Sequence, residues 1–124
     1  MRMPRPGRIG LLHLRVGLSD SFYMGPGRAD LMAFIAETGS ISEAAKRMGM
    51  SYKRAWGLVQ TLNDGFGRPL IETARGGKEQ GASLTDAGRE VLERYRGMQE
   101  ASRKAIARDL EALTALHSDI SNSK

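Results

Sequence analysis

The segment that decides the fold reads Gly39-Ser-Ile-Ser-Glu-Ala-Ala-Lys-Arg-Met-Gly-Met-Ser-Tyr-Lys-Arg-Ala-Trp-Gly-Leu-Val-Gln-Thr-Leu62. Ser40 and Ser51 are typical helix N-caps, and Glu43 follows Ser40 at the spacing of a capping box. Gly49 separates two apolar stretches and permits a sharp turn between them. The segment therefore predicts two short helices joined by a tight turn, the pattern of a DNA-binding helix-turn-helix.

Apolar side chains recur at helical spacing in both predicted helices, which gives each helix one inward face. In the second helix Trp56 and Tyr52 stand beside that face. Because large aromatic side chains are usually buried, we expect Trp56 to serve the core or helix packing rather than contact a base. The predicted inward residues are Ala44, Ala45 and Met48 in the first helix, and Ala55, Leu58, Val59 and Leu62 in the second.

Basic residues open the second helix of the motif, where a recognition helix enters the major groove most deeply. Arginine and lysine neutralise phosphates, and arginine also reads guanine with two hydrogen bonds. Gly57 follows one turn later, and its small size would let the helix backbone approach DNA. The alternative is an ordinary helical hairpin with a solvated basic face, but the alanine pair, the glycine turn and the two caps favour DNA binding. The predicted DNA-binding residues of this helix are Ser51, Tyr52, Lys53, Arg54, Gly57, Gln60 and Thr61.

Short strands are predicted on both sides of the helices. Alternating apolar residues over 12–18 and the run 22–24 predict an N-terminal hairpin, and a helix follows from Arg28 to a stop at Gly39. Residues 63–68 read as a loop that ends at Pro69. The strands 70–73 and 82–84 then form a second hairpin, typical of a wing. At its tip Arg75 and Lys78 either contact the DNA backbone or minor groove, or are only solubilising charges of a turn; both interpretations stay open.

A long helix is predicted after Thr85, which can cap it, with Asp86 well placed for the helix dipole. Its apolar seam is longer than a domain of this size needs for its own core, so we expect a coiled-coil-like homodimer. The predicted dimer residues are Val91, Tyr95, Met98, Ile106, Leu110, Leu113, His117 and Ile120. The fold class is thus mainly α with small β-hairpins. It comprises a flexible basic arm (1–10), a winged helix-turn-helix domain (11–84), a dimerisation helix (85–120) and a tail (121–124).

Composition narrows the classes of function. The 124 residues carry a formal net charge of +5, which suits a polyanionic partner. There is no cysteine, so disulfides, thiolate catalysis and cysteine-based zinc sites are excluded. The two histidines, His13 and His117, lie far apart, and no set of residues has metal-ligand spacing. We therefore expect neither catalytic residues, nor a metal, nor a cofactor, and with no secretion signal or apolar span we expect a cytoplasmic protein.

Several of these motifs together resemble the N-terminal domain of the ModE-type molybdate-responsive regulators. The similarity includes Gly39–Ala45, Met50–Trp56 with its Ser-Tyr-Lys-x-Ala-Trp element, Pro69–Glu72, Gly76–Lys78 and Leu84–Gly88, and it extends over about Leu11 to Tyr95. LysR-type regulators share a looser version. There an aromatic residue usually stands at the position of Ile71 and a basic residue at that of Thr73.

The resemblance implies a homodimeric winged helix-turn-helix that binds a palindromic operator in double-stranded DNA. In full-length ModE-type proteins molybdate binds a separate C-terminal domain, for which this chain has no room. The family's Ser-Ala-Arg-Asn molybdate motif is also absent, since Ala101–Lys104 reads Ala-Ser-Arg-Lys. We therefore expect no tight molybdate binding.

Two other interpretations stay open at this point. The long helix could be the working surface of a protein-interaction adaptor, or the chain could be the DNA-binding fragment of a LysR-type regulator. The sequence leaves open whether the chain acts alone or is a piece of a longer regulator.

Overall fold

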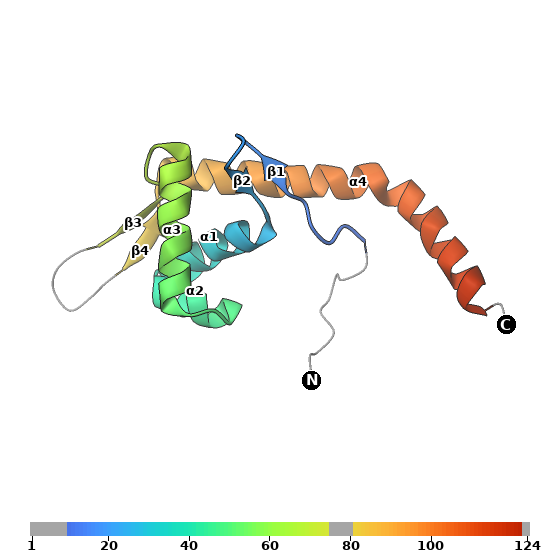
Figure 1. The fold of residues 1–124 in the computed structure, drawn as a ribbon, viewed down its shortest axis with the longest axis horizontal. Coiled ribbons are helices and arrows are strands. Elements are labelled where there is room, and N and C mark those ends of the chain that lie inside the picture. The colour runs from blue at the N-terminus through green and yellow to red at the C-terminus, as the bar shows by residue number, and fades with distance from the viewer. Residues whose placement is uncertain (1–9, 75–80, 123–124) are drawn as a thin grey trace.

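The computed structural model describes residues 10–74 and 81–122, with side chains as far as residue 118. Four helices carry most of the chain, and two short antiparallel hairpins flank the helix-turn-helix (Figure 1). The predicted fold class is confirmed. The elements are β1 (Val16–Gly17), β2 (Tyr23–Met24), α1 (Pro26–Thr38), α2 (Ile41–Met48), α3 (Tyr52–Phe66), β3 (Ile71–Thr73), β4 (Ala82–Leu84) and α4 (Asp86–Asn122).

The N-terminal hairpin is shorter than its alternating sequence predicts. Only two residue pairs join β1 and β2, Val16 with Met24 and Gly17 with Tyr23. The residues before β1 run beside α4 instead (Figure 1). There the hydroxyl of Tyr95 donates a hydrogen bond to the Leu14 carbonyl at 2.6 Å. The first predicted strand is therefore mostly an extended segment packed on a helix.

Glycines and caps set the ends of α1 and α2. Helix α1 begins at Pro26 rather than at Arg28, because proline is suited to the first helical position, where no N–H is needed. It ends at Gly39 in the left-handed conformation, with φ of 72°. The Ser40 hydroxyl then accepts a hydrogen bond from the Glu43 N–H at 3.0 Å, which confirms the predicted cap. The Ser40 N–H donates to Thr38 Oγ1 rather than to the Glu43 carboxylate, so only half of the capping box forms.

Helix α3 is one turn longer than predicted, because residues 63–66 continue it instead of forming a loop. Gly65 permits this extension at the point where the Phe22 ring lies on the helix. A Cβ at position 65 would lie 2.2 Å from Phe22 Cε1. Phe66 packs edge-on against the same ring, with 5.3 Å between ring centroids. The glycine that suggests a loop in the sequence is thus a packing residue inside a helix.

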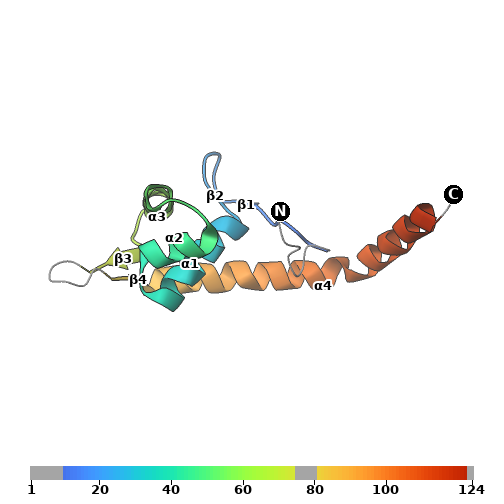
Figure 2. The same cartoon turned by 90° about the horizontal axis from the view of Figure 1, so that it is seen from below.

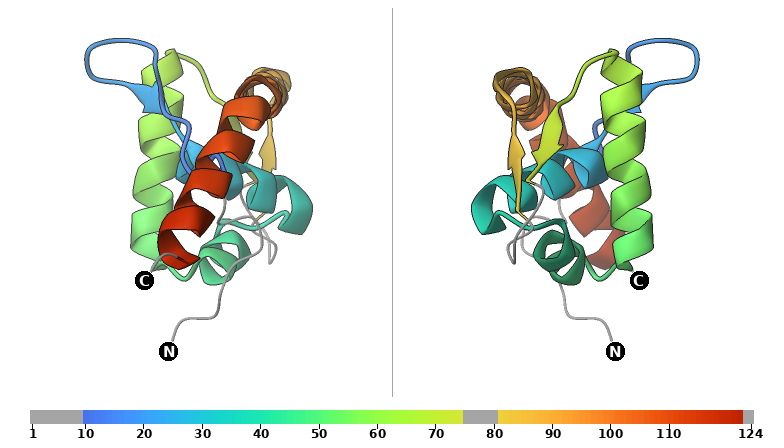
Figure 3. Two further views of the ribbon diagram at one scale, coloured as in Figure 1. Left: turned by 90° about the vertical axis from the view of Figure 1, so that its right-hand side faces the viewer. Right: turned by 90° about the vertical axis from the view of Figure 1, so that its left-hand side faces the viewer.

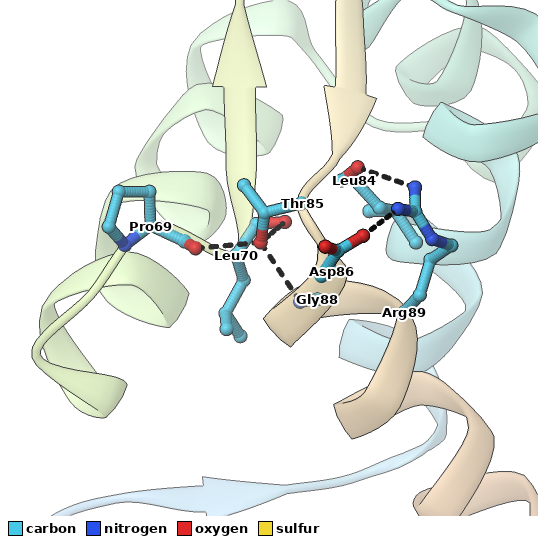
Figure 4. A network of polar contacts seen from close by, with 7 residues as sticks. All are labelled: Pro69, Leu70, Leu84, Thr85, Asp86, Gly88 and Arg89. Carbon is cyan, nitrogen blue, oxygen red and sulfur yellow. Dashed lines mark hydrogen bonds and ion pairs between the residues drawn. The ribbon is translucent and has the colours of Figure 1, made fainter.

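Thr85 joins the base of the wing to the start of α4 (Figure 4). Its Oγ1 accepts a hydrogen bond from the Gly88 N–H at 3.0 Å, as predicted for an N-cap, and donates to the Pro69 carbonyl at 2.8 Å. A Cβ at Gly88 would lie 2.1 Å from the Leu70 oxygen, so α4 packs directly on the backbone that precedes β3. The strands β3 and β4 pair over three residues each, from Ile71 with Leu84 to Thr73 with Ala82.

The core lies between α1, α2, α3 and the first half of α4. Figure 2 shows α1 and α2 between α3 and α4, and the right-hand view of Figure 3 shows β3 on the side of β4 that faces α3. Beyond this core α4 continues as an extended helix that bends away (Figure 1). None of the helices in the described ranges is long and apolar enough to cross a membrane. The largest fully buried side chains are Leu31, Met32, Ile35, Val59, Leu62, Leu70 and Tyr95.

Candidate nucleic-acid interface

The turn between α2 and α3 holds the two helices in close contact. Ala44, Ala45 and Ala55 are almost completely buried where the helices cross, so the small side chains allow the close approach that the sequence predicts. Gly49 adopts a left-handed conformation with φ of 66° and ends α2. The Met50 N–H then donates to the Ala45 carbonyl at 3.0 Å. Together these contacts form a helix-turn-helix with the predicted caps and inward faces.

The first turn of α3 is positive and exposed. The Ser51 hydroxyl caps it by accepting a hydrogen bond from the Arg54 N–H at 3.1 Å. Lys53 and Arg54 are both exposed, and this turn contains no acidic residue. No ion pair joins either cation to another described side chain, whereas Lys46 and Arg47 of α2 both pair with carboxylates. Since a helix N-terminus already favours anions, this end of α3 is suited to phosphate.

Gly57 lies one turn beyond Lys53 on the same exposed face. A Cβ built there would meet no heavy atom within 4 Å, so the fold itself does not require glycine at this position. Gln60 and Thr61 continue the exposed surface, and the Thr61 hydroxyl donates to the Gly57 carbonyl at 3.0 Å. The predicted residues from Ser51 to Thr61 thus share one solvent-facing side of α3.

Trp56 lies outside the buried core, so the part of its prediction that placed it in the core is wrong. Its side chain is 38% exposed, and Tyr52, one turn earlier, is 54% exposed. Ala55, Val59 and Leu62 fill the inward face, which leaves Trp56 at its edge. The helical spacing in the sequence indicates this exposed position. Trp56 follows Tyr52 by four residues and Lys53 by three, and so shares their side of the helix.

The wing is tied to the helix-turn-helix at its base. Asn63 of α3 accepts hydrogen bonds from the Leu70 and Ile71 N–H groups at 2.7 and 3.1 Å, and donates to the Ile71 carbonyl at 3.1 Å. On the other strand, the Ala82 N–H donates to the Gly39 carbonyl at 2.9 Å. The predicted wing-tip residues Arg75 and Lys78 lie outside the described residues. The positioning role of Asn63 is not evident from the sequence, because residues 63–68 read as a loop there.

The predicted dimer residues do not form one uniform seam on α4. Tyr95 is 1% exposed, and its hydroxyl contacts the chain's own N-terminal segment, so it offers almost no surface to a partner. Val91 packs against the same core, and Ile106 and Leu110 are half-buried. A methyl group added at Gly10 would approach Leu110 Cδ2 to 3.5 Å, which places the N-terminal segment beside this part of α4. Met98, Leu113 and His117 are exposed, and the side chain of Ile120 is outside the described part of the chain.

The surroundings of Tyr95 shift the pKa of its side chain. Burial raises the pKa of its phenol above the ordinary value of 10.0, and nearby Arg96 opposes this effect. The group is therefore a neutral hydrogen-bond donor to Leu14 at physiological pH. Within the described ranges no cluster of three or more histidine, aspartate or glutamate side chains could hold a metal ion.

Comparisons with known proteins identify relatives of this chain. Residues 29–89 match the family described as "Bacterial regulatory helix-turn-helix protein, lysR family". The chain is 41% identical over 85 residues to the molybdenum-pterin-binding protein MopB of Rhodobacter capsulatus, an alignment that covers 68% of this chain and 32% of MopB. It is 37% identical over 94 residues to the DNA-binding transcriptional dual regulator ModE of Escherichia coli (strain K12), with 75% of this chain and 36% of ModE covered. The chain thus spans about a third of the length of these curated relatives.

Solved structures give the same relationship in three dimensions. The crystal structure of the CbnR_DBD-DNA complex superimposes with a TM-score of 0.56 at 29% identity, over 70% of this chain and 95% of that one. Full-length CbnR in complex with its target DNA superimposes with a TM-score of 0.53 over 67% of this chain and 27% of that one. The N-terminal region of this chain is therefore a winged helix-turn-helix domain of the kind found in ModE-type regulators, and its helix-turn-helix also fits the broader lysR family.

Proposed function

We propose that this chain regulates transcription by binding double-stranded DNA through α3. The observation that carries the proposal is the exposed first turn of α3, where Lys53 and Arg54 stand at a capped helix N-terminus with no acidic neighbour in that turn. The similarity to CbnR_DBD, whose structure contains DNA, supports DNA binding by this fold.

The chemistry of the side chains on this surface indicates which part of the DNA they contact. Arg54 reads a guanine edge, because its guanidinium can donate two parallel hydrogen bonds there. Lys53 and the Ser51 hydroxyl contact phosphates, and Gly57 lets the helix backbone approach the duplex. Gln60 and Thr61 extend the polar contact, and Arg75 and Lys78 of the wing add charge. These interactions require an exposed, positively charged helix face, which α3 has.

We further propose that two copies of the chain bind a palindromic operator as a homodimer. Two leucines near the end of α4 support this assembly, since Leu113 and Leu116 are 63% and 58% exposed. Met98 and Leu18 also present apolar surface at a groove of about 400 Å³ between the N-terminal hairpin and the first half of α4. Burying these side chains against a second copy would remove them from water.

The experiment for DNA binding begins with selection of duplexes from a random pool, followed by a titration with fluorescence anisotropy. We expect a specific complex whose affinity falls steeply with salt, because phosphate contacts release counterions. The Arg54→Ala variant should bind more weakly, whereas Arg108→Ala, which removes an equal exposed charge from α4, should bind like the unmodified chain. Equal losses in both variants, or no selected duplex, would contradict the proposal.

The assembly is tested by light scattering at micromolar concentration. We expect the mass of a dimer, and we expect Leu113→Glu to shift the protein toward the monomer because it places a charge in the apolar contact. Ala115→Glu is the matched control, since position 115 lies on the opposite face of the helix from Leu113 and is exposed. A monomeric mass for the unmodified chain would exclude this dimer.

A further inference from the structure

The two exposed aromatic side chains of α3, Tyr52 and Trp56, carry apolar surface that the fold does not bury. Other large apolar side chains exposed in the described chain lie on the N-terminal segment and hairpin or on α4, away from the helix-turn-helix. Trp56 and Tyr52 alone stand beside its basic residues. Neighbouring exposed apolar side chains rimmed by polar residues are a feature of interaction sites.

The side of α3 on which Tyr52 and Trp56 lie follows from two reference points on the helix, Asn63 and Gly65. Asn63 lies on the same side of α3, about two turns beyond Trp56, and its side chain bonds the strand at the base of the wing. Phe22 lies against Gly65, on a different side of the helix. Tyr52 and Trp56 therefore border the exposed Lys53–Gly57 face on the side of the wing.

We propose that Trp56, flanked by Tyr52, forms an apolar contact with the C5-methyl group of a thymine in the major groove. The inference rests on the proposed DNA-binding function and specifies which feature of the base sequence this part of α3 recognises. The site would take a duplex with an A·T pair oriented so that the thymine methyl group faces Trp56.

The chemistry of the major groove supports this choice of target. The thymine methyl is the apolar group that a base pair presents at that edge, while the other recognition groups are hydrogen-bond donors and acceptors. Lys53 and Arg54, exposed next to the aromatic pair, supply the charge that holds the phosphate backbone close. Gly57 adds no side chain that would keep the indole away from the groove floor.

The test uses the duplex selected for the unmodified chain and replaces its thymines by uracil one position at a time, which removes only the methyl group. At one thymine in each half-site we expect the affinity of the unmodified chain to fall about threefold to fivefold, as expected for burial of a single methyl group. Trp56→Ala should bind the thymine duplex more weakly and show no further loss with uracil at that position. Trp56→Phe should keep part of the uracil sensitivity, because a phenyl ring still reaches the methyl.

A second measurement uses the fluorescence of Trp56, which is the only tryptophan in the chain. We expect its emission to change on binding the selected duplex, and to change less when the critical thymine is replaced by uracil. Thermal unfolding of each variant provides the check on folding, and we expect little change because the side chain is partly exposed.

The outcomes separate the two proposals. If the unmodified chain binds its selected duplex but no thymine shows a uracil effect that Trp56→Ala abolishes, the contact is wrong and DNA binding stands. The same conclusion follows if Trp56 emission is unchanged in the complex. If no duplex is selected at all, both the contact and the DNA-binding function are overturned.

Discussion

Helices α3 and α4 are both amphipathic, but they differ in how much of their length packs against the core. Helix α3 has buried side chains from Ala55 to Leu62 and packs Phe66 in its last turn against Phe22. Helix α4 is buried only in its first half, as far as Tyr95 and Gln99, and becomes half-buried or exposed beyond that point. The length of α3 thus follows from the core, whereas the length of α4 exceeds what this core can cover.

The same contrast appears in their glycines. Each helix has one glycine in tight contact, Gly65 in α3 and Gly88 in α4, and one in open space, Gly57 and Gly97. The tight glycines are needed for packing of the chain on itself. The open glycines are not needed for this packing, so the fold alone gives no reason for glycine at positions 57 and 97.

The largest effect is expected for Gly88→Ala, which tests how firmly the start of α4 is fixed. The new methyl group would overlap the Leu70 carbonyl, a backbone atom that has no freedom to rotate away. We expect a loss of about 3 kcal/mol in the free energy of unfolding, measured by urea denaturation. A loss below about 1 kcal/mol would show that the contact relaxes easily.

A smaller effect is expected for substitutions in the first turn of α3, which should change the free energy of DNA binding rather than that of unfolding. Arg54→Ala should weaken specific DNA binding by about 1–3 kcal/mol if the side chain reads a base. Lys53→Ala should weaken specific and non-specific binding alike and lower the salt slope by about one, as expected for a phosphate contact. Anisotropy titrations at several salt concentrations measure both effects, and equal behaviour of the two variants would refute this division of roles.

The third prediction concerns the buried half of α4. Tyr95→Phe removes the hydrogen bond to the Leu14 carbonyl and should reduce stability by about 1 kcal/mol at neutral pH. Because burial raises the pKa of Tyr95 in the folded chain, the unfolded chain loses this proton first as the pH rises. The tyrosine therefore loses its stabilising effect above about pH 10, and the difference between the two proteins should shrink there. Urea denaturation of both proteins near pH 7 and above pH 10 provides the measurement, and a constant difference would argue against it.

The smallest effects separate the two open glycines. Gly57→Ala and Gly97→Ala should each stabilise the chain by at most about 1 kcal/mol, because alanine favours a helix and finds open space at both positions. Only Gly57→Ala should also weaken DNA binding, since the added methyl would stand between α3 and the groove. Thermal unfolding and anisotropy together test this pair, and unchanged DNA affinity in Gly57→Ala would remove the reason for glycine at that position.

Helices α2 and α3 could be predicted from the sequence because their ends depend on interactions between residues close in the chain. The caps at Ser40, Ser51 and Thr85 and the glycine turn at Gly49 depend on neighbours a few residues away, and the structure contains each of them. The errors arose where distant residues decide. Gly65 stays helical because Phe22 packs on it, and the segment around Leu14 leaves its hairpin because Tyr95 binds it from 81 residues away. Trp56 lies outside the core because its position on the helix, rather than its residue type, decides its exposure.

The hydrogen bonds of Asn63 and Thr85 have a consequence for the thermodynamics of binding. Asn63 joins the last turns of α3 to the first strand of the wing, and Thr85 joins that same region to α4. Helix α3, the wing base and the start of α4 are therefore held in one arrangement before any partner binds. A surface ordered in advance loses little conformational entropy on association, so more of its contact energy remains as affinity.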